Sequence, residues 1–306
     1  MKNHISLFIF AIALLSGPVS ANDLSMTAVK DTLASIPGEH NYIYVRTPLG
    51  EDEEKNYDEI TFYDGLGREL DFAQSYGADR AGAIMAHHHL IEYDSLGRKE
   101  KQWLSTNTSF SYMSPEDLKG GVLWDYHDAG KRSYLQTNYE SSPLNRITEQ
   151  YGVGDAWGDH PARMEYLTNI PADSLRCSFY FIDDNDSLIR RGDYRSGELQ
   201  VTKATDEDGK PTYTFVDKQG RTLLTRLGRG NQQADTYFVF DRFGRIRYVL
   251  PPMINDEISA GNLDLYAYQY LYDSFGRCIS KKLPGCAAIR YVYDLSLIHI
   301  SEPTRL

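Results

Sequence analysis

The amino-acid sequence predicts a mainly β protein, built from successive β-hairpins of a repeated sheet, with a short helix or two near the N-terminus. The first indication is a hexapeptide of pattern aromatic-Asp-x-x-Gly-Arg that occurs four times, whereas ordinary residue frequencies would supply on the order of 0.01 copies. The second is the composition, because 23 Tyr and 24 Gly residues favour strands and tight turns. The third is the alternation of Tyr266, Tyr268, Tyr270 and Tyr272, which has the period of a β-strand and predicts an aromatic row on one face.

The repeated hexapeptide predicts the tip of a β-hairpin. Its Asp can accept a hydrogen bond from a backbone N–H two residues on, and its Gly supplies the left-handed conformation that closes a type I turn with a bulge. The aromatic residue ends one strand as a core anchor, while the Arg begins the next strand and can reach back to the Asp carboxylate. The four predicted structural tips comprise Tyr63, Asp64, Gly67, Arg68, Tyr93, Asp94, Gly97, Arg98, Phe240, Asp241, Gly244, Arg245, Tyr272, Asp273, Gly276 and Arg277.

The first 21 residues have the features of a secretory signal peptide. Lys2 gives a positive start, residues 5–15 form an apolar run too short to span a bilayer, and Val19-Ser20-Ala21 fits a small-x-small cleavage site. We therefore expect a protein that is secreted or held at the cell surface, with an uncleaved N-terminal anchor as the alternative. No later stretch has the length and apolarity of a transmembrane segment.

The rest of the chain divides into three regions. Residues 22–150 form an N-terminal region with the first hairpins, and a weak amphipathic pattern at its start predicts a short helix or a disordered segment. Residues 151–294 form a repeated β-sheet segment that opens with a Gly-rich hinge. Residues 295–306 match, from Leu295 to Arg305, the translation of a transposase-type sequencing adapter, and they interrupt a repeat that opens at Tyr293-Asp294. We expect the native protein to continue beyond this point, and we exclude the tail from the fold.

Local signals place the remaining elements. Residues 41–48 read as a strand ended by Pro48, and hairpins are expected at 60–72 and 90–104. Ser114 and Pro115 have the residue types that cap and begin a short helix, and Tyr126 to Lys131 is a degraded copy of the hexapeptide. Further strands and turns are expected at 164–168, 177–182, 183–187, 206–210, 212–216, 217–221 and 237–241.

The net charge bears on the binding partners of the chain, and the cysteine count bears on disulfide bonds. A formal charge of −11 and a pI near 5.2 argue against nucleic acid, which binds basic surfaces. The cysteines, Cys177, Cys278 and Cys286, form an odd set, so at least one thiol is unpaired. Pairing across the turn at 283–286 would place Cys278 opposite Tyr291 rather than opposite Cys286. We therefore expect buried free thiols instead of a disulfide.

No residues in the sequence have the spacing of a catalytic, cofactor or metal site. His87-His88-His89 would put only two side chains on one strand face, whereas a zinc site needs three or four ligands. The acidic stretches at 51–54 and 183–187 lack the ligand spacing of a calcium loop. Nucleophile elbows, phosphate loops and zinc helix motifs do not occur. We expect no enzymatic activity and no cofactor.

These tips, taken in series, resemble the Rhs/YD-repeat family. Segments at 41–48, 142–146, 164–169 and 247–252 are similar to exported bacterial members that open with a poorly characterised N-terminal domain. The resemblance covers residues 41 to 294. It implies that the hairpins belong to one long sheet that winds into a hollow cocoon around a C-terminal polypeptide, often a toxin, usually behind a self-cleaving core domain. The chain would then supply a partial open shell, and its partner would be its own C-terminal continuation.

Three classes of function follow from these observations. The first is a non-catalytic shell segment of an Rhs/YD-repeat protein. The second is a carbohydrate-binding protein that meets cell-surface glycans through exposed aromatic side chains, with Trp103, Trp124 and Trp157 as candidates. The third is metal-dependent hydrolysis through the run of three histidines, which the missing third ligand disfavours.

Overall fold

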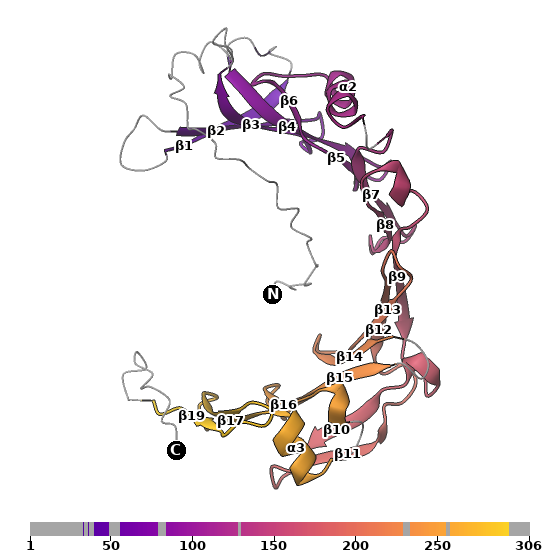
Figure 1. Cartoon of the computed structure of the whole chain (residues 1–306), viewed down its shortest axis with the longest axis vertical. Coiled ribbons are helices and arrows are strands. Elements are labelled where there is room, and N and C mark those ends of the chain that lie inside the picture. Colours follow the sequence, from indigo (N-terminus) through magenta and orange to yellow (C-terminus); the bar gives the residue numbers. More distant parts are fainter. Residues whose placement is uncertain are drawn as a thin grey trace. The chain divides into compact units, whose positions relative to one another are not determined.

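The computed structural model describes residues 40–48, 56–78, 84–127, 130–228, 233–254 and 258–293, together with Leu33 and Ile36. The predicted signal peptide, the acidic loop at 51–54 and the tail at 295–306 lie outside these residues. Within them the chain forms nineteen β-strands and two α-helices, and the strand pairs are antiparallel (Figure 1). The predicted mainly β fold built from hairpins is therefore confirmed.

The chain divides into two compact units, and each unit is made of two separate segments of the sequence. Unit 1 contains residues 1–138 and 151–159, and unit 2 contains residues 139–150 and 160–306. The Gly-rich stretch that the sequence suggested as a hinge lies in unit 1, because Gly154 donates its N–H to the carbonyl oxygen of Arg132 over 2.7 Å and Asp155 accepts from the N–H groups of Lys131 and Arg132.

Unit 1 is a run of hairpins with one helix. Its elements are β1 (Asn41–Pro48), β2 (Asn56–Tyr63), β3 (Glu69–Ala78), β4 (Ile84–Tyr93), β5 (Lys99–Trp103), β6 (Thr106–Ser109), α2 (Pro115–Asp125), β7 (Tyr134–Tyr139) and the short helix η2 (Asp155–Trp157). Strands β1 to β4 pair in sequence order. The first half of β4 also pairs with β6 and its second half with β5, so the sheet branches at β4.

Local sequence signals set the ends of elements in unit 1. The hydroxyl of Ser114 accepts the N–H of Asp117 at the start of α2, and Pro115 occupies the first helical position, as predicted. Leu118 and Val122 are the buried residues of this helix. The degraded hexapeptide copy at Tyr126 keeps part of the tip geometry, because Gly130 has φ +73° and its N–H donates to the His127 carbonyl oxygen over 3.3 Å. It follows α2 instead of a strand, since Tyr126 ends that helix.

Unit 2 continues as an antiparallel ladder. Its strands are β8 (Ile147–Tyr151), β9 (Ala162–Thr168), β10 (Ser178–Ile182), β11 (Leu188–Asp193), β12 (Gln200–Thr205), β13 (Pro211–Val216), β14 (Thr222–Leu227), β15 (Ala234–Phe240), β16 (Ile246–Leu250), β17 (Tyr268–Tyr272), β18 (Cys278–Lys282) and β19 (Ile289–Arg290). The ladder runs β8-β9-β12 and then through every strand to β19, whereas β10 and β11 form a separate hairpin. The short helices are η3 (Asp173–Leu175), η4 (Pro252–Ile254) and α3 (Ala260–Tyr266).

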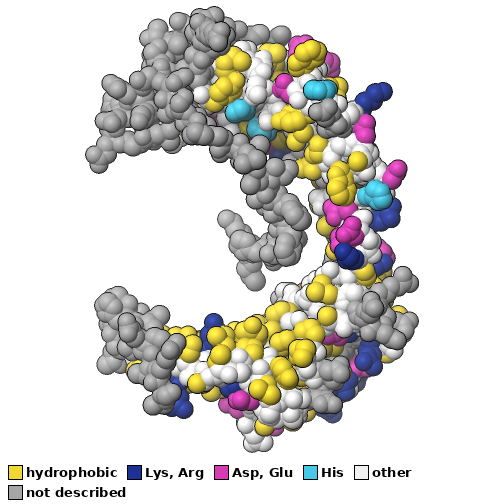
Figure 2. Space-filling view, viewed as in Figure 1, with side chains coloured by type: hydrophobic (Ala, Val, Ile, Leu, Met, Phe, Trp, Pro, Cys, Tyr) yellow, Lys and Arg dark blue, Asp and Glu magenta, His cyan; other side chains and the backbone are white. Residues whose placement is uncertain are grey.

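Each unit has its own hydrophobic core. In unit 2 the strand faces bury residues such as Val201, Phe215, Leu224 and Val239, and Figure 2 shows hydrophobic side chains gathered around β14 to β16. In unit 1 the core is smaller and contains Ile36, Ile60, Phe62, Ala73, Ile84, Ala86 and Phe110. No helix in the described parts of the chain has the length and apolarity needed to cross a membrane.

The predicted row of four tyrosines on one strand face is wrong at its first member. Tyr266 is the last residue of α3, because the Ser259 hydroxyl accepts the N–H of Asn262 and starts a helix ahead of the strand. Only Tyr268, Tyr270 and Tyr272 lie on β17, and Tyr268 is 36% exposed, so this row is not a buried core.

The three thiols are free, as expected, but only Cys177 is buried. Cys286 is exposed because it lies in the turn whose Gly285 has φ +65° and whose Cys286 N–H donates to the Leu283 carbonyl oxygen. The pairing predicted for Cys278 is also shifted by one residue, because the Tyr291 N–H donates to the carbonyl oxygen of Ile279.

Candidate functional site

The candidate site is the series of hairpin tips. In the first tip the Asp64 N–H donates to the Arg68 carbonyl oxygen over 2.9 Å, and the Gly67 N–H donates to the Asp64 carbonyl oxygen over 3.0 Å. The Asp64 Oδ1 atom accepts the N–H groups of Leu66 and Arg68 at 2.8 and 2.9 Å, and its Oδ2 atom accepts Arg68 Nε at 2.7 Å. This Asp therefore organises the whole turn through one carboxylate.

The other three predicted tips repeat this geometry. Asp94, Asp241 and Asp273 each accept two backbone N–H groups on Oδ1 and the Nε of their own tip arginine on Oδ2, with donor–acceptor distances from 2.7 to 2.9 Å. The structure thus places all sixteen predicted residues in four equivalent turns. Within each tip the Asp and the Arg are in contact, and the Arg of one tip also contacts the aromatic residue of the next.

The tip glycines have the predicted left-handed backbone. Their φ angles are +76° at Gly67, +81° at Gly97, +78° at Gly244 and +81° at Gly276, so this prediction is confirmed. In the variant tips at Asp206 and Asp217, Gly209 and Gly220 also have positive φ angles. At the tip of the β10–β11 hairpin the same place is taken by Asp186, with φ +62°.

The hydrogen bonds lower the pKa values of the tip carboxyls. For Asp64 the main cause is the backbone hydrogen bond from Arg68. For Asp94, Asp241 and Asp273 burial raises the pKa, and the hydrogen bonds from the tip arginine outweigh this effect and lower it. These carboxylates are therefore charged at neutral pH and occupied by the turn.

The tip arginine also reaches forward to the following hairpin. In unit 1 the Arg68 guanidinium lies 4.5 Å from the ring centre of Tyr93, the first residue of the next tip. A Cβ atom added to Gly97 would lie 3.0 Å from Arg68 Nη1. The glycine of a tip thus serves two purposes, because it adopts positive φ and leaves room for the preceding arginine.

Unit 2 repeats this forward contact along consecutive hairpins. Arg221 lies 5.1 Å from the ring centre of Phe240, Arg245 lies 4.9 Å from that of Tyr272, and Arg277 lies 4.9 Å from that of Tyr293. Arg245 Nη1 also donates to the carbonyl oxygen of Asp273 over 3.2 Å. We call this series of tip arginines and following aromatic residues the tip ladder.

Three of the tyrosines that contact an arginine also donate a hydrogen bond to the preceding strand. The hydroxyls of Tyr93, Tyr166 and Tyr293 donate to the carbonyl oxygens of Glu69, Ile147 and Cys278, at 2.6, 3.0 and 2.8 Å. In each case the acceptor is the residue directly after the arginine, which is Arg68, Arg146 or Arg277. Sequence reasoning missed this forward contact, although the regular order of Arg and a later aromatic residue was a usable signal.

The histidine run forms a buried structural contact. His88 is buried in β4, where Nδ1 lies 2.6 Å from Asp71 Oδ2 and Nε2 lies 2.9 Å from the Ser109 carbonyl oxygen. His87 stacks on Tyr76 with ring centres 4.4 Å apart. No group of three or more His, Cys, Asp or Glu side chains suited to a metal ion occurs among the described residues. The sequence did not predict the pairing of His88 with Asp71, because these residues lie on different strands.

Comparisons with known proteins agree with this architecture. Residues 41–168 match the family model of a domain of unknown function, DUF6443. The crystal structures of TcdB2-TccC3-Cdc42 and TcdB2-TccC3 share the fold, with TM-scores of 0.52 and 0.51 at 14% and 13% sequence identity. Each alignment covers 84% of this chain and 12% of the other, so the chain corresponds to a small part of those proteins. No curated protein matches the sequence.

Residues 41–168 are thus similar to the DUF6443 family, and the repeated tips lie in a fold similar to that of these two crystal structures.

Proposed function

We propose that this chain is a non-catalytic structural segment of an exported Rhs/YD-repeat protein. Its hairpins would form part of a β-shell that, in a longer parent protein, encloses a C-terminal polypeptide. The observation that carries the proposal is the tip ladder, in which Arg221, Arg245 and Arg277 each contact the first residue of the following tip. Such contacts join each hairpin to the next along one edge of the sheet, as an extended wall requires.

The chemistry of the tips supports a structural role over a catalytic one. A general acid or base needs a carboxyl group that is available to a substrate and has a pKa near the working pH. Each tip carboxylate accepts three hydrogen bonds from its own turn, and its pKa is lowered. His88 has both ring nitrogens against protein acceptors and is buried. These groups are therefore committed to holding strands together.

Protease protection in the longer parent protein tests the shell. We expect its C-terminal polypeptide to resist trypsin at concentrations that digest the same polypeptide expressed alone. Arg245→Ala, which removes a contact between tips, should increase cleavage of the enclosed part. Arg242→Ala is the matched control, because Arg242 lies in the same tip and contacts Phe243 of its own turn. Equal cleavage of the enclosed and isolated polypeptides would refute enclosure.

Carbohydrate binding is the second candidate function, and one observation favours it. The Trp124 side chain on α2 is 83% exposed, and exposed indole rings are common stacking surfaces for sugars. Trp103 is less suited, because its indole N–H donates to Glu92 over 3.0 Å. Titration of the chain with cell-surface oligosaccharides should then change tryptophan fluorescence and lose the change in Trp124→Ala. An unchanged signal across a glycan panel would remove this candidate.

A further inference from the structure

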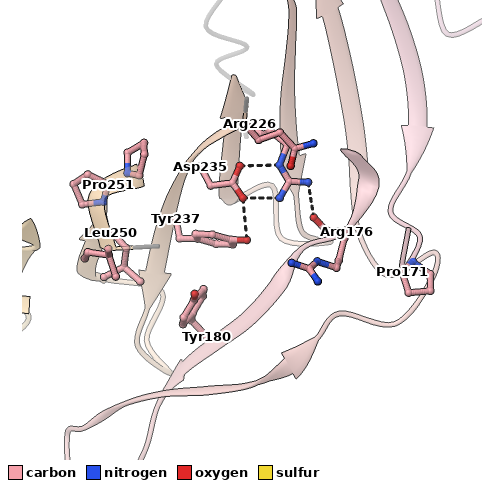
Figure 3. A pocket seen from close by; sticks show the side chains of 11 residues that line it. Pro171, Arg176, Tyr180, Arg226, Asp235, Tyr237, Leu250 and Pro251 are labelled. Atoms are coloured by element: carbon pink, nitrogen blue, oxygen red, sulfur yellow. Dashed lines mark hydrogen bonds and ion pairs between the residues drawn. The ribbon is translucent and has the colours of Figure 1, made fainter. Parts of the chain in front are cut away.

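A cavity of about 410 Å³ lies in unit 2, at the ends of strands β14, β15 and β16 (Figure 3). Its size falls in the range of small-molecule sites. The wall combines an ion pair, two tyrosines, an arginine and a group of apolar side chains. The apolar part is supplied by Pro171, Leu250, Pro251, Pro252 and Ile254.

The ion pair makes a neutral rear wall. Arg226, which is 3% exposed, donates through Nε to one carboxylate oxygen of Asp235 and through Nη2 to the other, at 2.7 and 2.5 Å. Its Nη1 atom donates to the carbonyl oxygens of Ser174 and Arg176, at 2.9 Å each. The negative charge of Asp235 is therefore neutralised, and it does not repel an anion that enters the cavity.

Arg176 supplies the charge that remains. Its side chain is exposed at the rim, and Figure 3 shows the guanidinium group turned toward Tyr180 and Tyr237. No other residue in the described ranges forms a hydrogen bond or ion pair with this guanidinium group. The cavity thus carries one net positive charge in a chain whose formal charge is −11.

The tyrosines add a neutral polar surface. Burial raises the pKa of Tyr237 to about 12, so its phenol remains protonated at neutral pH. Its hydroxyl contacts Asp235 Oδ2 and the Ser178 N–H over 3.4 Å each, which are long hydrogen bonds. The rings of Tyr180 and Tyr237 pack edge to face with centres 4.8 Å apart and present aromatic carbon to the cavity.

We propose that this cavity binds a small organic carboxylate with an apolar body. The planar guanidinium group of Arg176 matches a carboxylate through two parallel N–H donors. Pro171 and Pro252, which are exposed, and the edges of the tyrosine rings would contact the apolar part of the ligand. Inorganic phosphate fits the same cation, but it makes no contact with the prolines and the tyrosine rings and should bind more weakly.

The test is a calorimetric titration of the full chain with naphthalene-2-carboxylate. Arg176→Gln should weaken binding about tenfold, the usual effect of losing a charge-assisted hydrogen bond. Arg191→Gln is the matched control, because it removes an exposed arginine from β11 of the same unit and should leave the affinity unchanged. The neutral naphthalene-2-carboxamide should bind wild type and Arg176→Gln equally.

Three results would overturn the proposal. They are equal affinity of wild type and Arg176→Gln for the carboxylate, equal weakening in both arginine variants, and phosphate binding as tight as that of naphthalene-2-carboxylate. Thermal unfolding of each variant shows that the fold is retained, which an exposed arginine permits. None of these readouts depends on enclosure of a C-terminal polypeptide, so the cavity and the shell can fail separately.

Discussion

The two units have the same hairpin tips and different interiors. In unit 1 the carboxylate of Asp58, which is fully buried, accepts Arg46 Nε at 2.7 Å, Arg46 Nη2 at 2.9 Å and the Tyr44 hydroxyl at 2.6 Å. The buried pair of Asp71 and His88 joins β3 to β4 nearby in the same unit. In unit 2 the strand faces pack apolar side chains into a larger cluster, and the ion pair of the buried Arg226 with Asp235 is present beside them.

This difference shows that the repeat specifies the edge of the sheet but not the side chains that fill its interior. The hexapeptide determines the edge of the sheet, because its Asp accepts the backbone N–H groups of the turn and its Gly closes the turn with a positive φ. The faces of the strands are set by each segment's own side chains, and a polar or an apolar interior satisfies the same edge. Burial of charged pairs is the costlier solution, since both partners lose hydration.

The largest effect is expected from the apolar interior of unit 2. Phe215→Ala empties a fully buried position and should lower the free energy of unfolding by about 4 kcal/mol. All three tryptophans, Trp103, Trp124 and Trp157, lie in unit 1. Urea unfolding should therefore show an early transition in far-ultraviolet circular dichroism and a nearly unchanged transition in tryptophan fluorescence. A matching shift in both signals would contradict separate interiors.

The buried polar pair of unit 1 should give the next largest effect. His88 Nδ1 lies 2.6 Å from Asp71 Oδ2, and its Nε2 lies 2.9 Å from the Ser109 carbonyl oxygen, so the side chain links β3, β4 and β6. Asp71→Ala leaves His88 without its partner and should cost about 3 kcal/mol, measured by tryptophan fluorescence in urea. Asp71→Asn should recover most of this loss, because its amide can donate to a neutral imidazole. Equal losses in the two variants would show that the net charge of the pair matters more than its hydrogen bond.

Substitution of the tip glycine allows the stability of the same turn to be compared between the two units. Gly97→Ala in unit 1 requires positive φ and places Cβ 3.0 Å from Arg68, whereas the nearest arginine atom at Gly276 in unit 2 is 3.8 Å away. We expect a loss of about 1–2 kcal/mol for Gly97→Ala and a smaller loss for Gly276→Ala. Gly65→Ala, at an open position without positive φ, is the control and should be close to neutral. The order of the three unfolding midpoints checks the prediction.

A double-mutant cycle measures one contact of the tip ladder. Arg245→Gln and Tyr272→Leu should show a coupling energy of about 0.5–1 kcal/mol, the range for a cation above an aromatic ring at a partly exposed site. The cycle of Arg242→Gln with Tyr272→Leu should show none, because Arg242 contacts Phe243 within its own turn. Equal coupling in the two cycles would mean that the arginine acts through general charge.

The smallest effect is expected on the free energy of unfolding at acidic pH. Hydrogen bonds from Arg146 and then Ser142 lower the pKa of Glu140 from 4.5 to about 2. Its contribution to stability is therefore complete above pH 4.5 and is lost as the pH falls toward 2. Glu140→Gln should flatten the fall of unfolding free energy in that range, while Glu207→Gln at an exposed tip should leave it unchanged. Parallel curves for wild type and Glu140→Gln would disprove the assignment.

Local chemistry made part of this structure predictable from the sequence. The tips were predictable because Asp, Gly and Arg act within six residues, and the start of α2 was predictable because Ser114 and Pro115 suffice to cap it. Tyr266 was misplaced because alternating tyrosines look alike to a strand pattern whether or not the first belongs to a preceding helix. The cavity around Arg176 was not predictable, since its wall comes from strands and loops far apart in the chain.

The forward contact of the tip arginine gives the repeat series a direction. Each completed tip already presents its guanidinium group when the next aromatic residue, such as Tyr272 or Tyr293, leaves the ribosome. Synthesis of one hairpin takes on the order of seconds, whereas a hairpin forms in about 1–10 μs. Each hairpin is therefore folded before the next one is synthesised, and its tip arginine offers a contact for the next aromatic residue. Growth from the N-terminus toward the C-terminus then needs no later hairpin to be present, so the sheet can lengthen one repeat at a time during translation.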